Sequence, residues 1–416
     1  MSRQLTILLS AYACEPGRGS EPGVGWNWAR HLSREHEVWV ITRANNRAPI
    51  EAALRREPLP NAHFVYFDLP RWARFWKRGS FGLRTYYYVW QAGALFTARR
   101  LSRRVSFDLV HHVTFVKYWM PSFLALLGPP FIWGPVGGGE STPRAFRSAY
   151  SLRGRIYEAA RGIARALGSA DPFVALTARR AAIGFATTAD TAARMRALGC
   201  RDVRVLPEAA LSNEDLAELG RPREPRPGPV RIVSLGGLLH LKAYDLSLRA
   251  FARFINDGGA GEYWLVGDGP ERRRLEALAA SLGVADRVRF CGMMPRPQAI
   301  DLLRQADILA HPSLHDSGGW TCLEGMAAGK PVVCMECGGP AEQVTPETGI
   351  RVPPNTPEQA VADLAVAFET LALNPELRAR MGEAGRARVL RDFCWSTRPA
   401  RLLALCGDAS REGVRQ

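Results

Sequence analysis

Two carboxylates, Asp316 and Glu324, flank a turn of small residues with the types and spacing of a sugar nucleotide site. Residues 307–311 read as a buried strand and residues 321–329 as a helix, with the turn between them. Backbone N–H groups at a helix start attract diphosphate, and carboxylates accept hydrogen bonds from sugar hydroxyls. The plain alternative, left open at this point, is that Asp316 caps the helix and Glu324 is a solvated helix residue.

The segment from Asp316 to Val333 resembles the signature of the retaining glycosyltransferases of family 4. That signature is a carboxylate, seven residues, a glutamate on a helix of small residues, a glycine and Pro-Val-Val. The resemblance implies that Asp316 is a catalytic residue that holds hydroxyls of the donor hexose, that Glu324 holds the donor ribose, and that Gly319 lies at the donor. The family usually has glutamate at the first position, so Asp316 has a reach shorter by one methylene group.

A second segment, from Ser234 to Asp245, is similar to the Gly-Arg-Leu and Lys-Gly element of the same family. The resemblance implies that Lys242 neutralises the donor diphosphate and that Gly236 and Gly237 line the donor site. Gly237 stands where the family has an arginine, and Ala243 stands where it has a glycine. His240 or an arginine elsewhere is a candidate substitute cation, and a surface lysine at a helix start is the alternative for Lys242.

Two other glycine-bearing loops are expected near the donor. Gly338 and Gly339 follow the Pro-Val-Val strand, and Gly19 and Ser20 follow the first strand, where the family has a loop that faces the donor. The spacing of the first loop does not fit the dinucleotide fingerprint, and no acidic residue ends the second strand. These departures argue against a hydride-transfer enzyme.

The segment from Trp133 to Glu140 resembles a Gly-Pro-Val-Gly-Gly-Gly-Glu element of some bacterial polysaccharide-type members. The resemblance implies an acceptor-side loop that contains Gly137, Gly138 and Glu140.

A histidine pair, His111 and His112, ends another predicted strand. Family members often carry a histidine near this place that contacts the donor sugar, so both are catalytic candidates. Because successive strand side chains point to opposite faces, we expect at most one of them to face the substrates and the other to be structural.

The elements that must position these residues alternate between apolar strands and amphipathic helices in two blocks, which predicts an α/β fold with two parallel doubly wound sheets. The resemblance implies the GT-B architecture, in which two Rossmann-like domains face each other across a cleft. We predict an N-terminal acceptor-side domain, a proline-rich linker, a C-terminal nucleotide-binding domain and a last helix that returns toward the first domain. Their bounds are 1–206, 207–229, 230–395 and 396–416.

The 416 residues contain no apolar run close to the roughly 20 residues that span a bilayer, so a cytoplasmic protein is expected. The 8 cysteines are scattered without zinc spacing and are expected to be reduced. No cofactor and no metal site are expected. The resemblance implies that basic residues and the N-terminal ends of helices neutralise the charge of the diphosphate.

The chain has a formal charge of +15, and the location of its basic residues indicates where the acceptor is found. Residues 71–104 hold no Asp or Glu and mix arginine and lysine with aromatic residues, which favours peripheral binding to an anionic membrane surface. Residues 144–165 add arginines on a segment that is expected to form an amphipathic helix. A solvated basic face is the alternative, and nucleic acid is not expected because no nucleic-acid motif accompanies the charge. The expected interfacial anchors are Trp72, Trp76, Tyr86, Tyr87, Tyr88 and Trp90.

Together these observations predict a retaining transferase that moves a hexose-type sugar from a nucleotide diphosphate sugar to a hydroxyl of a glycan or lipid-linked acceptor, as in polysaccharide biosynthesis. A sugar-nucleotide epimerase or hydrolase on the same fold stays open. So does a non-catalytic basic protein that binds membrane or nucleic acid, for which the missing arginine at Gly237 is the best argument.

Overall fold

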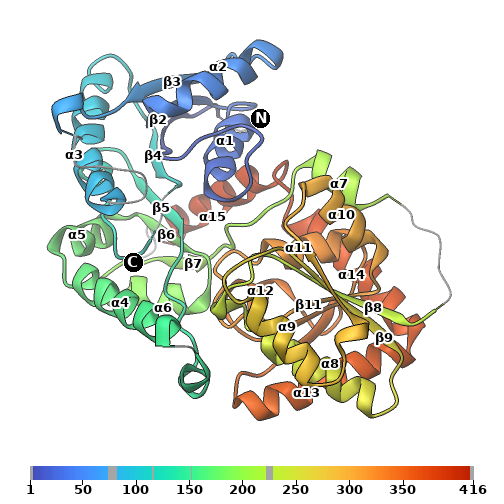
Figure 1. Ribbon diagram of the computed structural model, residues 1–416. Coiled ribbons are helices and arrows are strands. Elements are labelled where there is room, and N and C mark those ends of the chain that lie inside the picture. Colours follow the sequence, from blue (N-terminus) through green and yellow to red (C-terminus); the bar gives the residue numbers. More distant parts are fainter. Residues whose placement is uncertain (1–2, 74–81, 115–116, 151, 222–227, 413–416) are drawn as a thin grey trace. The chain divides into compact units, whose positions relative to one another are not determined.

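The computed structural model describes residues 3–73, 82–114, 117–150, 152–221 and 228–412 (Figure 1). The chain divides into two compact units. The first contains Met1–Gly139, Arg161–Glu208 and Arg398–Gln416, and the second contains Glu140–Ala160 and Ala209–Thr397. Each unit is built around one parallel sheet.

The sheet of the first unit has the strand order β3-β2-β1-β4-β5-β6-β7, and every neighbouring pair is parallel. Leu8 of β1 and Val110 of β4 belong to a core that also takes in Tyr87 and Trp90 of helix α3. Helices cover the sheet, so its central strands are buried apolar runs. The strands are β1 Thr6–Ser10, β2 Glu37–Arg43, β3 Ala62–Phe67, β4 Leu109–His112, β5 Phe131–Val136, β6 Ile183–Ala186 and β7 Val203–Val205.

The helices of the first unit begin at recognisable capping residues in two cases. Asp171 accepts from the backbone N–H of Phe173 at the start of α5, and Thr188 accepts from that of Thr191 at the start of α6. The helices are α1 Ser20–Leu32, α2 Arg47–Arg56, α3 Leu83–Leu101, α5 Pro172–Arg180, α6 Ala189–Ala197 and α15 Arg398–Glu412, with short 3-10 turns η1 Ala44–Asn46, η2 Arg71–Ala73 and η3 Phe123–Leu126. Helix α4 Leu152–Ser169 runs through the residue at which the units divide.

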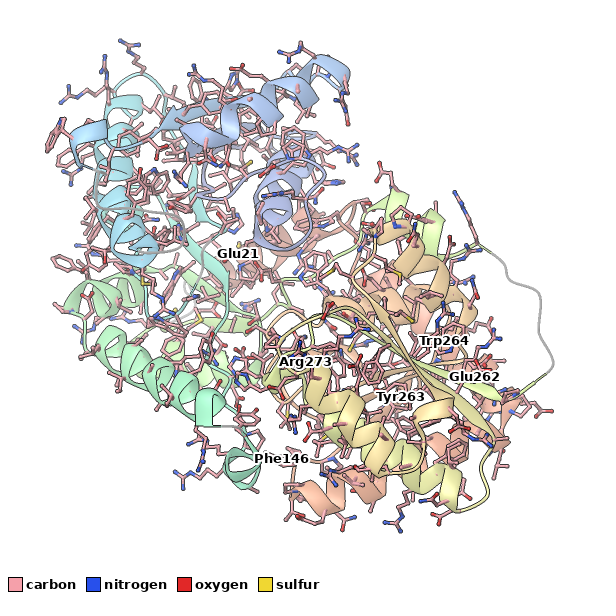
Figure 2. All side chains as sticks on the ribbon, viewed as in Figure 1. Glu21, Phe146, Glu262, Tyr263, Trp264 and Arg273 are labelled. Atoms are coloured by element: carbon pink, nitrogen blue, oxygen red, sulfur yellow. The ribbon has the colours of Figure 1, made fainter. Side chains whose placement is uncertain are left out.

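The sheet of the second unit has the order β10-β9-β8-β11-β12-β13, and its pairs are also parallel. Neighbouring residues of one strand enter different cores: Tyr263 packs on one face of β9 and Trp264 on the other (Figure 2). This alternation makes both faces apolar. The strands are β8 Val230–Leu235, β9 Gly261–Val266, β10 Val288–Gly292, β11 Ile308–His311, β12 Val332–Met335 and β13 Gly349–Val352.

The helices of the second unit cover both faces of its sheet, as Figure 1 shows for α8 and α11. They are α7 Asn213–Leu219, α8 Tyr244–Asn256, α9 Arg272–Ser281, α10 Arg296–Gln305, α11 Trp320–Ala327, α12 Gly338–Gln343, α13 Pro357–Leu373 and α14 Pro375–Asp392, with 3-10 turns η4 Arg144–Ala149, η5 His240–Lys242 and η6 Ala285–Arg287.

The domain bounds seen in the structure differ from the predicted ones in two places. Residues 140–160 group with the second unit, although the sequence assigned them to the first domain. The predicted linker 207–229 contains the folded helix α7, which begins with a capping box between Ser212 and Asp215. Within that linker, residues 222–227 lie outside the described residues. The last helix, α15, belongs to the first unit, where Arg398 lies over the ring of Trp28.

Candidate functional site

The loop between β11 and α11 holds Asp316 in a dense set of hydrogen bonds. Its Oδ1 accepts from the backbone N–H groups of Gly318 at 3.2 Å and Gly319 at 3.0 Å. Its Oδ2 accepts from Nζ of Lys242 at 2.6 Å and from Nε2 of His311 at 3.0 Å. A carboxylate offers about four acceptor positions, and these four donors fill them.

The cluster keeps its charges although it is buried. Burial by itself would raise the pKa of Asp316, but the hydrogen bond from His311 and the charge of Lys242 bring that pKa well below its usual range. Burial lowers the pKa of His311, so its imidazole is neutral at pH 7 and donates from Nε2. The cluster is therefore an ion pair of Lys242 and Asp316, supported by a neutral histidine.

Lys242 reaches Asp316 from the loop between β8 and α8. The residue after it, Ala243, has a φ of 48° and a ψ of 38°, a left-handed conformation that glycine adopts more easily. Ala243 thus adopts a conformation for which glycine would be the more suitable residue. The backbone N–H of Leu314 donates to the carbonyl of Leu241 at 3.0 Å, which ties this loop to the one after β11.

The site of the missing arginine, Gly237, has room for a side chain. A Cβ atom there would meet nothing closer than 3.6 Å, and Gly237 is not among the glycines with positive φ. Its neighbour Gly236 has a φ of 136° and lies against Gly267, where an added Cβ would come within 2.1 Å of the carbonyl oxygen of Gly236. Neither a positive φ nor a clash at the Cβ position therefore requires glycine at residue 237.

The second carboxylate, Glu324 on α11, contacts an arginine that the sequence analysis missed. Nη1 of Arg296 donates to Oε1 of Glu324, and Nη2 of Arg296 donates to Oδ1 of Asp215 at 2.9 Å. Burial raises the pKa of Glu324 above its ordinary value of 4.5, and Arg296 offsets part of that rise. No motif marks Arg296, which is the first residue of α10.

The Gly338 loop packs directly on the Asp316 loop. Gly338 has a φ of 55°, and a Cβ atom there would lie 2.3 Å from the carbonyl oxygen of Asp316, so only glycine fits. The backbone N–H of Gly339 donates to the same carbonyl at 2.7 Å. Behind Gly319, whose φ is 61°, Nε2 of Gln343 donates to the carbonyl of Gly318 at 2.6 Å.

Glu140, predicted on the acceptor side, is grouped by the structure with these loops. It belongs to the second unit, is 2% exposed and accepts from Oγ of Ser317 at 2.7 Å. Its Cγ lies 3.4 Å from the Cβ position of Gly338. Glu140, Ser317 and Gly338 thus form one cluster beside Asp316, and the assignment of Glu140 to the acceptor stays a prediction.

The four predicted residues of the two N-terminal glycine-bearing loops lie in the first unit. Gly19 caps α1, and Ser20 is the first residue of that helix. Gly137 pairs with Lys117 in an isolated bridge. Gly138 has a φ of 92°, and a Cβ atom there would lie 2.6 Å from the ring of Trp119.

The two histidines of β4 are both buried, each 1% exposed. Nε2 of His111 donates to the carbonyl of Gly134 at 2.7 Å. His112 makes hydrogen bonds with Tyr87 at 3.0 Å and Ser10 at 3.1 Å. Burial lowers the pKa of His111 to about 4 and that of His112 to about 3. These contacts favour structural, neutral roles for both rings rather than for one of them.

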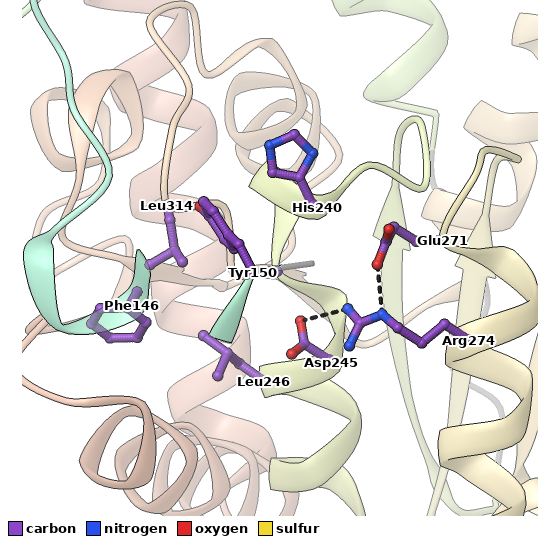
Figure 3. Close-up of a pocket in the computed structure, with 9 residues that line it drawn as sticks. Phe146, Tyr150, His240, Asp245, Leu246, Glu271, Arg274 and Leu314 are labelled. Carbon is purple, nitrogen blue, oxygen red and sulfur yellow. Dashed lines mark hydrogen bonds and ion pairs between the residues drawn. The ribbon is translucent and has the colours of Figure 1, made fainter. Parts of the chain in front are cut away.

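A small pocket lies between η4 and the start of α8 in the second unit, and Figure 3 shows the side chains that line it. Arg274 is held there by Glu271 at 2.6 Å and Asp245 at 3.6 Å. His240, the candidate substitute cation, meets the ring of Tyr150 edge-on at 5.0 Å. The charged groups of this pocket are thus engaged with one another.

The predicted membrane anchors are wrong for three residues. Tyr86, Tyr87 and Trp90 are 0% exposed, because α3 turns them toward the core of the first unit. Tyr88 donates to Asp171 at 2.9 Å, and Trp72 is 78% exposed. Trp76 lies outside the described residues.

Across the described ranges, no helix is long and apolar enough to cross a membrane. Within the same ranges no three His, Cys, Asp or Glu side chains gather as a metal site would require. None of the eight cysteines, all of which are described, forms a disulfide.

Comparison with known proteins relates the chain to sugar transferases. Residues 218–388 match the family described as "Glycosyl transferases group 1". The chain is 33% identical over 206 residues, 48% of its length and 55% of that protein's, to the lipopolysaccharide core biosynthesis glycosyltransferase LpsD of Rhizobium meliloti. It is 29% identical over 272 residues, 62% of its length and 66% of that protein's, to the 2-deoxystreptamine glucosyltransferase of Streptomyces kanamyceticus. The chain therefore spans about half to two thirds of these relatives.

Solved structures resemble the chain over nearly its whole length. The sucrose-phosphate synthase of Thermosynechococcus elongatus has a TM-score of 0.63 at 18% identity and covers 98% of this chain and 100% of its own. Anabaena HepE, solved in complex with UDP, has a TM-score of 0.58 at 16% identity and covers 96% and 100%. At these identities the likeness concerns the fold, and it confirms the expected GT-B fold of two Rossmann-like domains.

Proposed function

We propose that this chain, whose residues 218–388 match the group 1 glycosyltransferases, transfers a hexose-type sugar from a nucleotide diphosphate sugar to a hydroxyl of a glycan or lipid-linked acceptor. The observation that carries the proposal is the pair of loops after β8 and β11, which brings Lys242 to Asp316 at the carboxyl ends of parallel strands. Ligands of open α/β sheets bind at that edge. Glu324 follows on the next helix, where it accepts hydrogen bonds from the donor ribose.

The ion pair of Lys242 and Asp316 is, in this proposal, the resting state of the donor site. The diphosphate carries more negative charge than one carboxylate, so its arrival draws the ammonium of Lys242 away from Asp316. Oδ2 of Asp316 then regains an acceptor position, and a hydroxyl of the donor hexose takes it. In this scheme Lys242 binds the diphosphate first and Asp316 binds the hexose second. All four acceptor positions of Asp316 are filled before the donor arrives, and the departure of Lys242 opens one of them.

Retention of configuration follows if the acceptor hydroxyl attacks on the face from which the nucleotide leaves. A diphosphate oxygen then takes the acceptor proton, and Lys242 with the start of α11 stabilises the charge that develops on the diphosphate. His111 and His112 have no step in this scheme, because both rings are buried and neutral in the first unit.

The acceptor is proposed to lie at an anionic membrane surface, with helix α4 as the contact. Ile156, Ile163 and Leu167 are 61%, 62% and 69% exposed, and their spacing puts them on one side of the helix. The helix has several arginines and one acid, Glu158. An exposed apolar strip with cationic neighbours suits the headgroup region of an anionic bilayer.

A product assay tests the function. Purified protein is incubated with UDP-, GDP- and ADP-sugars and with glycan or lipid-linked acceptors, and glycosylated product and free nucleotide are measured by mass spectrometry. Stoichiometric formation of both supports the transferase. Free nucleotide without glycosylated product, or an isomerised sugar nucleotide, indicates the hydrolase or epimerase, and binding without any turnover indicates the non-catalytic alternative.

A further inference from the structure

One arginine joins three helices of the second unit beside the proposed ribose site. Arg296 begins α10 and donates to Glu324 of α11 through Nη1 and to Asp215 of α7 through Nη2. The three positions are far apart in sequence, since Arg296 is 28 residues from Glu324 and 81 residues from Asp215. A guanidinium holds its N–H groups in a fixed fork, so two carboxylates on one fork have defined directions.

Asp215 is itself held in place. Its Oδ2 accepts from the backbone N–H of Ser212 at 3.1 Å and from the Ser212 hydroxyl at 2.9 Å, while its backbone N–H donates to that hydroxyl. This capping box uses Oδ2 and leaves Oδ1 for Arg296. Asp215 is thus a rigid anchor at the start of α7, from which Arg296 reaches Glu324.

We propose that Arg296, anchored by Asp215, positions the carboxylate of Glu324 for the ribose hydroxyls of the sugar nucleotide. The inference rests on the proposed function, in which Glu324 binds the ribose. Arg296 engages Oε1 of Glu324, and the other oxygen of the carboxylate is the acceptor for the ribose. Arg296 acts through Glu324, and so it is a positioning residue rather than a catalytic one.

If Arg296 positions Glu324, the pH dependence of nucleotide binding should change when Arg296 is replaced. A link that only holds the helices together would not have that effect. Burial raises the pKa of Glu324, Arg296 of α10 lowers it, and Asp215 of α7 raises it. On the α14 side, Arg386 donates to the carbonyl of Ala327. Without Arg296, burial and Asp215 act unopposed, so Glu324 binds a proton at a higher pH. A protonated carboxyl accepts ribose hydroxyls less well, and binding then weakens as the pH falls.

Calorimetry with UDP, GDP and ADP, each beside its 2′-deoxy and 3′-deoxy analogue, tests the proposal between pH 5.5 and 8.5. The wild type is expected to prefer a ribonucleotide over one of its deoxy analogues. Arg296→Gln is expected to reduce that preference about tenfold and to move the acid-side fall in affinity to a higher pH than in the wild type. Arg296→Lys restores part of both. The matched control is Arg253→Gln, which breaks the exposed pair of Arg253 and Asp257 on α8 and leaves both readouts unchanged.

The outcomes distinguish a failure of the proposed function from a failure of the positioning role of Arg296. If the folded wild type binds none of the nucleotides, the proposed function fails, and this inference fails with it. If the wild type binds and Glu324→Ala weakens binding, but Arg296→Gln changes neither the deoxy preference nor the pH profile, only the positioning role is overturned. Tighter binding by Arg296→Gln also overturns it, because Arg296 would then compete with the ribose.

Discussion

Nζ of Lys242 lies 2.6 Å from Oδ2 of Asp316, with the two side chains 18% and 16% exposed. The sequence predicts separate roles for these residues, with Lys242 binding the diphosphate and Asp316 binding the hexose. Their ion pair makes them one charge-balanced unit before any donor arrives. An exposed pair contributes little, whereas a largely buried one makes the loss of either partner costly, because the other charge is left uncompensated.

Lys242→Ala is the first test of that unit. The change removes the cation for the diphosphate and leaves the charge of Asp316 facing it, so nucleoside diphosphate affinity should fall by one to two orders of magnitude, or about 1.5–3 kcal/mol. Nucleoside affinity should change little. Calorimetry with both ligands on folded protein decides, and an equal loss for the two would make Lys242 a structural residue.

The double variant Lys242→Ala/Asp316→Asn is the matching control. It removes both charges at once, so part of the lost diphosphate affinity should return relative to Lys242→Ala alone. If the loss instead adds up from the two single variants, the two residues act independently and the proposed exchange of partners is wrong.

Gly237→Arg should strengthen diphosphate binding. A Cβ atom fits at this position without a clash, and a guanidinium pairs with phosphate oxygens in bidentate geometry. We expect nucleoside diphosphate affinity to rise about tenfold, with nucleoside affinity unchanged. Gly237→Gln, which adds length without charge, should give no gain. A loss of binding in the folded arginine variant would show that the donor does not pass Gly237.

Nucleotide affinity should also depend on pH through Glu324. Its pKa is raised above 4.5, so the carboxylate that accepts ribose hydroxyls is present above the raised pKa and is lost as the pH falls through it. Affinity should therefore drop toward acid pH before Asp316, with its lowered pKa, is protonated. Glu324→Gln should bind weakly at every pH and flatten the profile. A wild-type affinity that is level down to pH 4.5 would contradict the ribose role.

Much of the fold was predictable because buried parallel strands are continuous apolar runs. The apolar runs at residues 5–11, 37–42, 63–67, 109–113, 131–133, 183–187, 231–235, 262–266, 288–291, 308–311 and 331–334 predict eleven strands. All eleven form, within one or two residues at most ends. Two strands, β7 and β13, were missed, since each is short and has an arginine, Arg204 or Arg351, within it. A three- or four-residue run with a charge has no signal that separates it from a loop.

The site residues that lie within one sequence motif were predictable, and those that come from distant parts of the chain were not. The Asp316 loop and Glu324 lie within one motif, whereas Arg296 and Asp215 reach Glu324 only through tertiary packing. The prediction of membrane anchors among the aromatic residues of 71–104 was partly wrong for a related reason. Composition groups all of them, but the helical period turns Tyr86 and Trp90 into the core.

Helix α4 should carry membrane binding if the acceptor is lipid-linked. Replacing Ile156, Ile163 and Leu167 with glutamine removes the exposed apolar strip, so cosedimentation with anionic liposomes should fall severalfold at physiological salt. Binding by the wild type should weaken as salt rises, since the arginines of the helix are screened. Replacement of Val366 and Leu373, which are 57% and 72% exposed on α13, is the matched control and should leave binding intact. Equal binding of wild type to neutral and anionic liposomes, or none to either, would exclude this anchor and favour an acceptor free in solution, because the charge of the chain would then have no lipid partner.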